Sequence, residues 1–118
     1  MKDYNVILDK TFNFAIRIVR LYTYLKDEKK EFVLSKQVLR SGTSIGANIR
    51  EAVKAQSKAD FLSKLYIAYK EAGETEYWID LLSATGFLSE REFSSMKDDC
   101  IEIIKILTTI IKSLKEQQ

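Results

Sequence analysis

Histidine is absent from this 118-residue sequence, and Cys100 is its single cysteine. Without histidine the chain lacks the commonest general base at neutral pH and the commonest zinc ligand. Zinc sites and Ser-His or Cys-His catalysis are therefore excluded, and neither an enzymatic activity nor a cofactor is expected. A lone cysteine cannot form an internal disulfide, which fits a reducing compartment and predicts a cytoplasmic location. Cys100 itself is expected to be a small buried hydrophobic residue.

Proline is also absent, and glycine occurs only four times. Few chains of this length lack proline unless they are almost entirely helical, because loops use proline in turns. No run approaches the roughly 18 uncharged apolar residues that would span a membrane. The start Met1-Lys2-Asp3-Tyr4 is unlike a signal peptide. The length predicts one domain, residues 1–118.

Four segments carry apolar residues at helical steps of three and four. The first, at about residues 6–26, has two neighbouring stripes that together predict a wide core-facing side. The first stripe is Leu8, Phe12, Ala15, Val19 and Tyr22, and the second is Phe14, Ile18, Leu21 and Leu25. The second segment, at about residues 32–55, contains Gly42 and Gly46 on one line. Glycine is unfavourable inside a helix, so this pair predicts close approach of a neighbouring helix.

The third and fourth segments begin with the spacing of a helix capping box, at Ser57 with Asp60 and at Ser89 with Glu92. Gly86 is the expected stop between them. The connections are short, so consecutive helices must lie antiparallel. The predicted fold is all-α, an antiparallel up-down-up-down four-helix bundle.

The middle of the chain resembles a known family. Residues 37–45 read QVLRSGTSI, residues 48–52 read NIREA, and Glu74, Thr75, Tyr77 and Trp78 follow. This pattern resembles the four-helix-bundle family of 23S rRNA intervening-sequence proteins, to which the accessory variability proteins of diversity-generating retroelements are similar. Gly46 departs from it, standing where many members carry proline.

The resemblance implies a bacterial protein with no established catalytic activity that assembles as a homo-oligomer, a pentamer in some members. The retroelement members further imply nucleic acid and a reverse transcriptase as partners.

Charge is unevenly distributed along the chain. Residues 29–70 hold nine Lys or Arg and three Asp or Glu, whereas residues 71–103 hold two Lys or Arg and nine Asp or Glu. One interpretation is a basic face on the second helix and the start of the third that binds RNA or DNA phosphates. Its residues are Lys36, Arg40, Arg50, Lys54 and Lys58, of which the last three are spaced to lie on one helical line. The alternatives are an ordinary solvated face, or a basic patch that meets the acidic patch of a neighbouring subunit.

Polar and aromatic residues leave further alternatives. Arg40 or Asn48 is expected to pair with Glu74 in a structural network between helices, in preference to Glu71 and Glu74 acting as a catalytic carboxylate pair. Tyr77 and Trp78 are expected in a subunit interface, with a wide core or base stacking as alternatives. The sequence therefore predicts a non-enzymatic homo-oligomer that binds nucleic acid. The alternative is a protein-binding adaptor whose charged patches mediate ring assembly.

Overall fold

Helix is the dominant structure of the chain. The computed structural model describes residues 2–117, although not the side chains of Lys2 and Asp3. Its helices are α1 (Lys2–Asp27), α2 (Leu34–Ala52), α3 (Lys58–Ala84) and α4 (Glu90–Glu116), and no strand occurs within the described residues. The prediction of an all-α four-helix bundle is confirmed.

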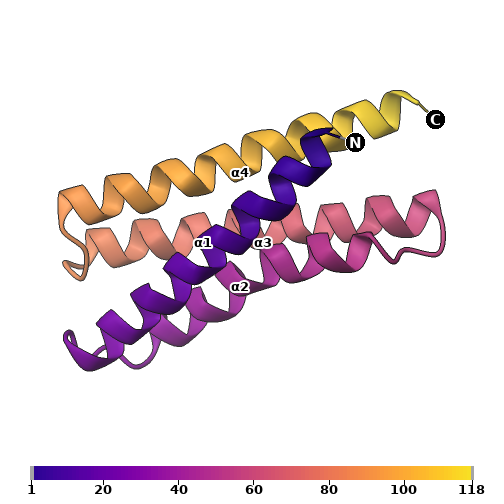
Figure 1. Cartoon of the computed structure of the whole chain (residues 1–118). Helices are drawn as coiled ribbons and strands as arrows, with labels where there is room; N and C mark the ends of the chain where they lie inside the picture. Colours follow the sequence, from indigo (N-terminus) through magenta and orange to yellow (C-terminus); the bar gives the residue numbers. More distant parts are fainter. Residues whose placement is uncertain (1, 118) are drawn as a thin grey trace.

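The helices pack in a closed order. Each helix contacts its neighbours in the chain, and α1 also contacts α4. Consecutive helices run in opposite directions, so both labelled termini lie at the same end as the turn between α2 and α3 (Figure 1). The molecule is 47 Å long, and a helix of 27 residues such as α3 spans roughly 40 Å at 1.5 Å per residue. The two ends of the bundle are therefore distinct surfaces.

The core uses one of the two apolar stripes of α1. Phe14, Ile18 and Leu25 are almost completely buried, as the second stripe predicts. The expectation that the first stripe is also in the core holds for Leu8, which packs against the core, but is wrong for Phe12 and Val19, which are 51% and 48% exposed. One helix in a four-helix bundle can bury only the side that faces the bundle axis. The first stripe lies beyond that side, at the edge of α1 next to α2.

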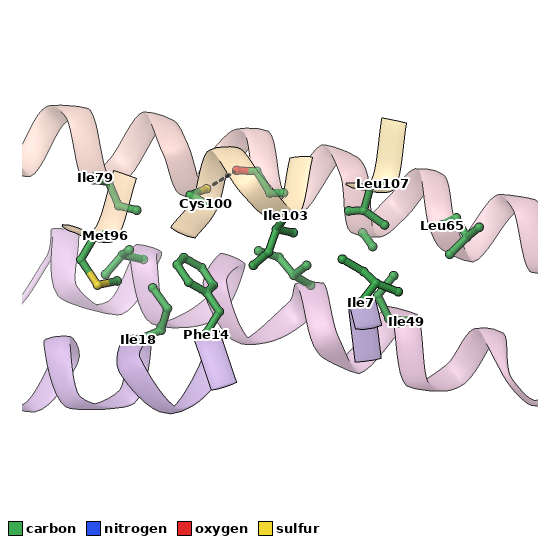
Figure 2. Close-up of a cluster of buried hydrophobic side chains, with 14 of the residues drawn as sticks. Ile7, Phe14, Ile18, Ile49, Leu65, Ile79, Met96, Cys100, Ile103 and Leu107 are labelled. Carbon is green, nitrogen blue, oxygen red and sulfur yellow. Dashed lines mark hydrogen bonds between the residues drawn. The ribbon is translucent and has the colours of Figure 1, made fainter. Parts of the chain in front are cut away.

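Cys100 lies inside this core, in agreement with the prediction from its helical position. Figure 2 shows it among Ile79, Ile103 and other apolar side chains, with its thiol directed at the carbonyl of Ala72, 3.4 Å away. Burial raises the pKa of the Cys100 thiol to about 12. A thiol with so high a pKa is not a nucleophile at neutral pH.

The two glycines of α2 permit close packing against α1. A Cβ atom at Gly42 would lie 2.7 Å from Ile18 Cγ1, and one at Gly46 would lie 3.3 Å from the carbonyl oxygen of Thr11. Carbon atoms normally approach to about 3.5–4.0 Å. The predicted close approach is therefore confirmed, and α1 is the partner.

The helix ends are capped by side chains, mostly as predicted. Ser89 and Glu92 form the full reciprocal capping box. Ser57 accepts a hydrogen bond from the Asp60 N–H, but the Asp60 carboxylate accepts from the N–H of Gln56 instead of Ser57. Gly86 ends α3 with φ +85°, a conformation that glycine adopts without strain.

Glu31 is a cap that the sequence analysis missed. Its carboxylate accepts hydrogen bonds from the N–H groups of Val33, Leu34 and Ser35, at 3.2, 3.0 and 2.6 Å. These bonds fix the start of α2 two residues later than predicted. Partial burial alone would raise the pKa of Glu31, but the hydrogen bonds outweigh it and hold that pKa below its ordinary value of 4.5.

Removing this cap is expected to destabilise the fold. Glu31→Ala should lower the free energy of unfolding by about 1 kcal/mol, because three N–H groups lose their acceptor. A lowered pKa in the folded state means that the contribution is present above pH 4.5 and lost as the pH falls through the folded value. Urea unfolding at pH 7 and pH 3 measures both effects. An equal difference between the wild type and the variant at the two pH values would contradict the prediction.

Candidate nucleic-acid interface

The predicted basic residues do not form one face. Lys36 lies in the first turn of α2 and Arg50 in its last turn, but α2 ends at Ala52. Lys54 is in the following turn, and Lys58 is the first residue of α3. The prediction that Arg50, Lys54 and Lys58 lie on one helical line is therefore wrong, because the chain reverses between them. These three residues instead surround the α2–α3 turn at one end of the bundle.

Arg40 is already engaged within the protein. Its guanidinium donates to Glu71, 3.0 Å away, and to Glu74. These two ion pairs join α2 to α3. The indole N–H of Trp78 donates to the same Glu74 oxygen at 3.0 Å. The Trp78 hydrogen bond, followed by Arg40, holds the pKa of Glu74 below its ordinary value despite partial burial. Such a network satisfies Arg40 and reduces its availability for phosphate.

Asn48 is not part of this network. Its amide donates to the carbonyl of Ser44, 2.8 Å away within α2, so the predicted contact with Glu74 is absent. Asn48 lies two turns beyond Arg40, too far along the helix to reach the same carboxylate. The buried hydrogen bond between α2 and α3 comes instead from Ser41 and Thr75, whose hydroxyl oxygens are 2.9 Å apart.

Tyr77 and Trp78, the predicted interface residues, lie on α3 beside this network. Their rings make an edge-to-face contact with centroids 5.1 Å apart. Tyr77 is 58% exposed, whereas Trp78 is partly buried and packs against the core. Of the two, Tyr77 offers the larger surface to a partner.

The antiparallel packing collects positive charge at one end. We define the basic end as the half of each helix nearest the α2–α3 turn, residues 2–14, 44–70 and 104–117. It holds ten Lys or Arg and five Asp or Glu, a net charge of +5. The acidic end, residues 15–43 and 71–103, holds nine Lys or Arg and twelve Asp or Glu, a net charge of −3. The small overall charge therefore conceals a charge difference along the bundle axis.

Most cations of the basic end have no acidic partner. Within the described part of the chain, only Lys10 and Lys64 of this end make ion pairs, with Glu102 at 2.8 Å and Glu51 at 3.5 Å. The cations that make none are Arg50, Lys54, Lys58, Lys70, Lys105, Lys112 and Lys115. Unpaired surface cations on one end are the arrangement that attracts a polyanion.

Grooves lie at this end on both sides of the bundle. Arg50 sits over the ring of Phe12 at 5.2 Å and lines a groove of about 470 Å³ between α1 and α2, together with Lys54. A second groove, of about 450 Å³ between α3 and α4, includes Lys112 and Lys115. The sequence analysis missed these two lysines because they are more than 50 residues from Lys58 in the chain. Antiparallel pairing of the third and fourth segments was the signal that could have found them.

Metal clusters and membrane-spanning helices are both absent from the described residues. In the described part of the chain no group of three or more Cys, Asp or Glu side chains is placed to hold a metal ion. None of the helices formed by residues 2–116 is long and apolar enough to cross a bilayer. The surface feature that stands out is the unpaired charge of the basic end.

The fold and this surface define a four-helix bundle with a basic end. The model of the 23S rRNA-intervening sequence protein family matches residues 3–109, and the chain belongs to this family. A crystal structure of a protein of unknown function from the S23 ribosomal protein family of Bacteroides thetaiotaomicron VPI-5482 is also similar. It is 60% identical, with a TM-score of 0.92 over 95% of this chain and 99% of that one. No match was found among curated proteins.

Proposed function

We propose that this protein is a non-enzymatic, cytoplasmic homo-oligomer of bacterial origin that binds nucleic acid through its basic end. The observation that carries the proposal is the +5 charge of that end, with Arg50, Lys54 and Lys58 outside any ion pair of the described chain. Lysine and arginine side chains that neutralise phosphates release counterions, which drives binding to polynucleotides. The family name refers to an rRNA intervening sequence and supports a setting in which RNA is close by.

The test is a titration of labelled RNA at two salt concentrations. A hairpin RNA, the corresponding DNA hairpin and an uncharged dextran are mixed with the full chain at 50 and 200 mM salt. We expect binding to the nucleic acids alone, with an affinity that falls by about tenfold or more at the higher salt, because several phosphates are neutralised. Absence of binding to both nucleic acids at 50 mM salt would refute the proposal.

Assembly is the second part of the proposal, and the exposed stripe of α1 supports it. Phe12, Ile16 and Val19 lie on one side of the helix and are each more than a third exposed. An exposed apolar stripe of this kind is typical of a surface that another protein covers. The negative acidic end and the positive basic end could add a charge-complementary contact between subunits.

We expect Phe12→Glu with Val19→Glu to convert the oligomer to monomers. Two buried charges without partners would cost several kcal/mol at each interface. Light scattering coupled to size exclusion measures the mass. Phe32→Glu is the matched control, because Phe32 is 53% exposed but precedes α2 on another surface. A double variant with the wild-type mass would exclude this stripe from the interface.

The alternative function is a protein-binding adaptor with no nucleic-acid role. Exposed Tyr77 in the acidic end favours it, since tyrosine is enriched in protein interfaces. A finer proposal is kinship with the accessory variability proteins of retroelements, with a reverse transcriptase as partner. Co-purification of such an enzyme with the full chain would support that kinship.

A further inference from the structure

We infer that the groove between α3 and α4 is a binding site for single-stranded nucleic acid, in which a base stacks on Tyr69, beside Tyr66, and phosphates contact Lys112 and Lys115. The inference rests on the proposed function and names the form of nucleic acid that the basic end recognises. The groove is lined by Tyr66, Tyr69, Thr108, Ile111, Lys112, Lys115 and Glu116.

The helical spacing places a pair of tyrosines on α3 opposite a pair of lysines on α4. Tyr66 and Tyr69 are three residues apart on α3, and Lys112 and Lys115 are three apart on α4, so each pair occupies one side of its helix. Lys115 Nζ lies 5.8 Å from the centroid of the Tyr66 ring. The two helices therefore present aromatic rings and ammonium groups to the same groove.

The tyrosine pair is not fully used by the fold. Tyr66 packs against the core on one side, while Tyr69 is 39% exposed. Neither phenol hydroxyl makes a hydrogen bond to another described residue. The Tyr69 ring therefore retains an exposed face, whereas the Tyr66 ring already lies between the core and the Lys115 ammonium group.

Charge on α4 suits a phosphate chain. Lys112 and Lys115 make no ion pair among the described residues, and Glu116 is the only carboxylate among the described residues that line the groove. Lys105 extends the line, because it lies seven residues before Lys112 on the same side of the helix. Its ammonium group also makes no ion pair within the described residues.

The combination of rings and cations favours an unpaired strand over a duplex. Bases in a duplex are stacked on each other, and their faces cannot reach a protein side chain. Aromatic side chains in a basic groove are the arrangement by which proteins bind single strands with little sequence preference. An acidic peptide would use the lysines but would gain little from the exposed aromatic face of Tyr69.

The experiment measures fluorescence anisotropy of three labelled probes with the full chain: 12-nucleotide oligouridine, 12-nucleotide oligothymidine and a 12-base-pair RNA duplex. Tyr69→Ala is expected to weaken binding of both single strands by about tenfold, the typical effect of losing one stacked base. Tyr69→Phe should keep wild-type affinity within about twofold, because stacking needs the ring. Phe32→Ala is the matched control, an exposed aromatic residue in the acidic end and outside the groove.

A second measurement locates the contact directly. Irradiated 5-bromouridine in the oligouridine probe should crosslink to the α3 peptide that carries Tyr66 and Tyr69. Crosslinks confined to other peptides would overturn the inference. So would equal losses of single-strand and duplex binding in Tyr69→Ala, or displacement of RNA by polyglutamate as strong as that by oligouridine.

The two proposals fail in different ways. If no probe binds the wild type, both are refuted. If the duplex and the single strands bind equally and Tyr69→Ala has no effect, the stacking site is refuted while the basic end survives.

Discussion

Gly42→Ala and Gly73→Ala are expected to shift the melting temperature in opposite directions, with a difference of about 4–12 °C between them. A methyl group at Gly42 would lie 2.7–2.8 Å from three side-chain carbons of Ile18, which is fully buried and cannot move aside. Overpacking of this kind costs about 1–3 kcal/mol, more than the roughly 1 kcal/mol that alanine gains in a helix interior. A Cβ atom at Gly73 would meet no atom within 4 Å, so Gly73→Ala should show only the stability that alanine gains in a helix interior.

Calorimetry or thermal circular dichroism measures this contrast, at about 4 °C per kcal/mol for a chain of this size. The matched test of the cause is Ile18→Ala with Gly42→Ala, since the shortened side chain leaves room for the new methyl group. The double variant should be more stable than the sum of the two single effects. Strict additivity would show that contact with Ile18 is not the source of the destabilisation.

Charge reversal at the basic end is expected to weaken RNA binding on the order of 10- to 100-fold. Lys54→Glu with Lys58→Glu removes two phosphate contacts and adds two repulsive charges next to the RNA. The dependence of log affinity on log salt should also become shallower by about 1.4 for a single strand. Both lysines are exposed, and glutamate in the first turn of α3 suits the helix dipole, so the fold should persist.

The control makes the same charge change at the acidic end. Lys30→Glu with Lys36→Glu alters two exposed lysines that make no ion pair with a described residue. It should weaken binding by less than about threefold, because these sites lie at the far end of the bundle (Figure 1). Equal losses in the two double variants would mean that net charge, and not the basic end, controls binding. Loss of the oligomer in Lys54→Glu with Lys58→Glu would instead identify an assembly surface.

Local sequence signals predicted the elements of the fold. The Ser89–Glu92 box predicted the start of α4 at its observed position. Gly86 was predicted to end α3 for the reason observed, a positive φ that glycine adopts freely. Each of these features depends on residues within one or two helical turns, where spacing alone determines the contacts. The Glu31 cap was missed because a carboxylate next to a lysine-rich loop looks like ordinary surface charge.

The sequence by itself determined the four helices, the close packing at Gly42 and Gly46, and the burial of Cys100. The tertiary structure decided which side of α1 is buried, because two apolar stripes competed and only contact with α2 and α4 selects one. It also decided where the charge gathers, since the linear tally placed it in residues 29–70 and ignored Lys112 and Lys115. Electrostatic attraction acts through space, so antiparallel packing created the basic end from segments that are far apart in the chain.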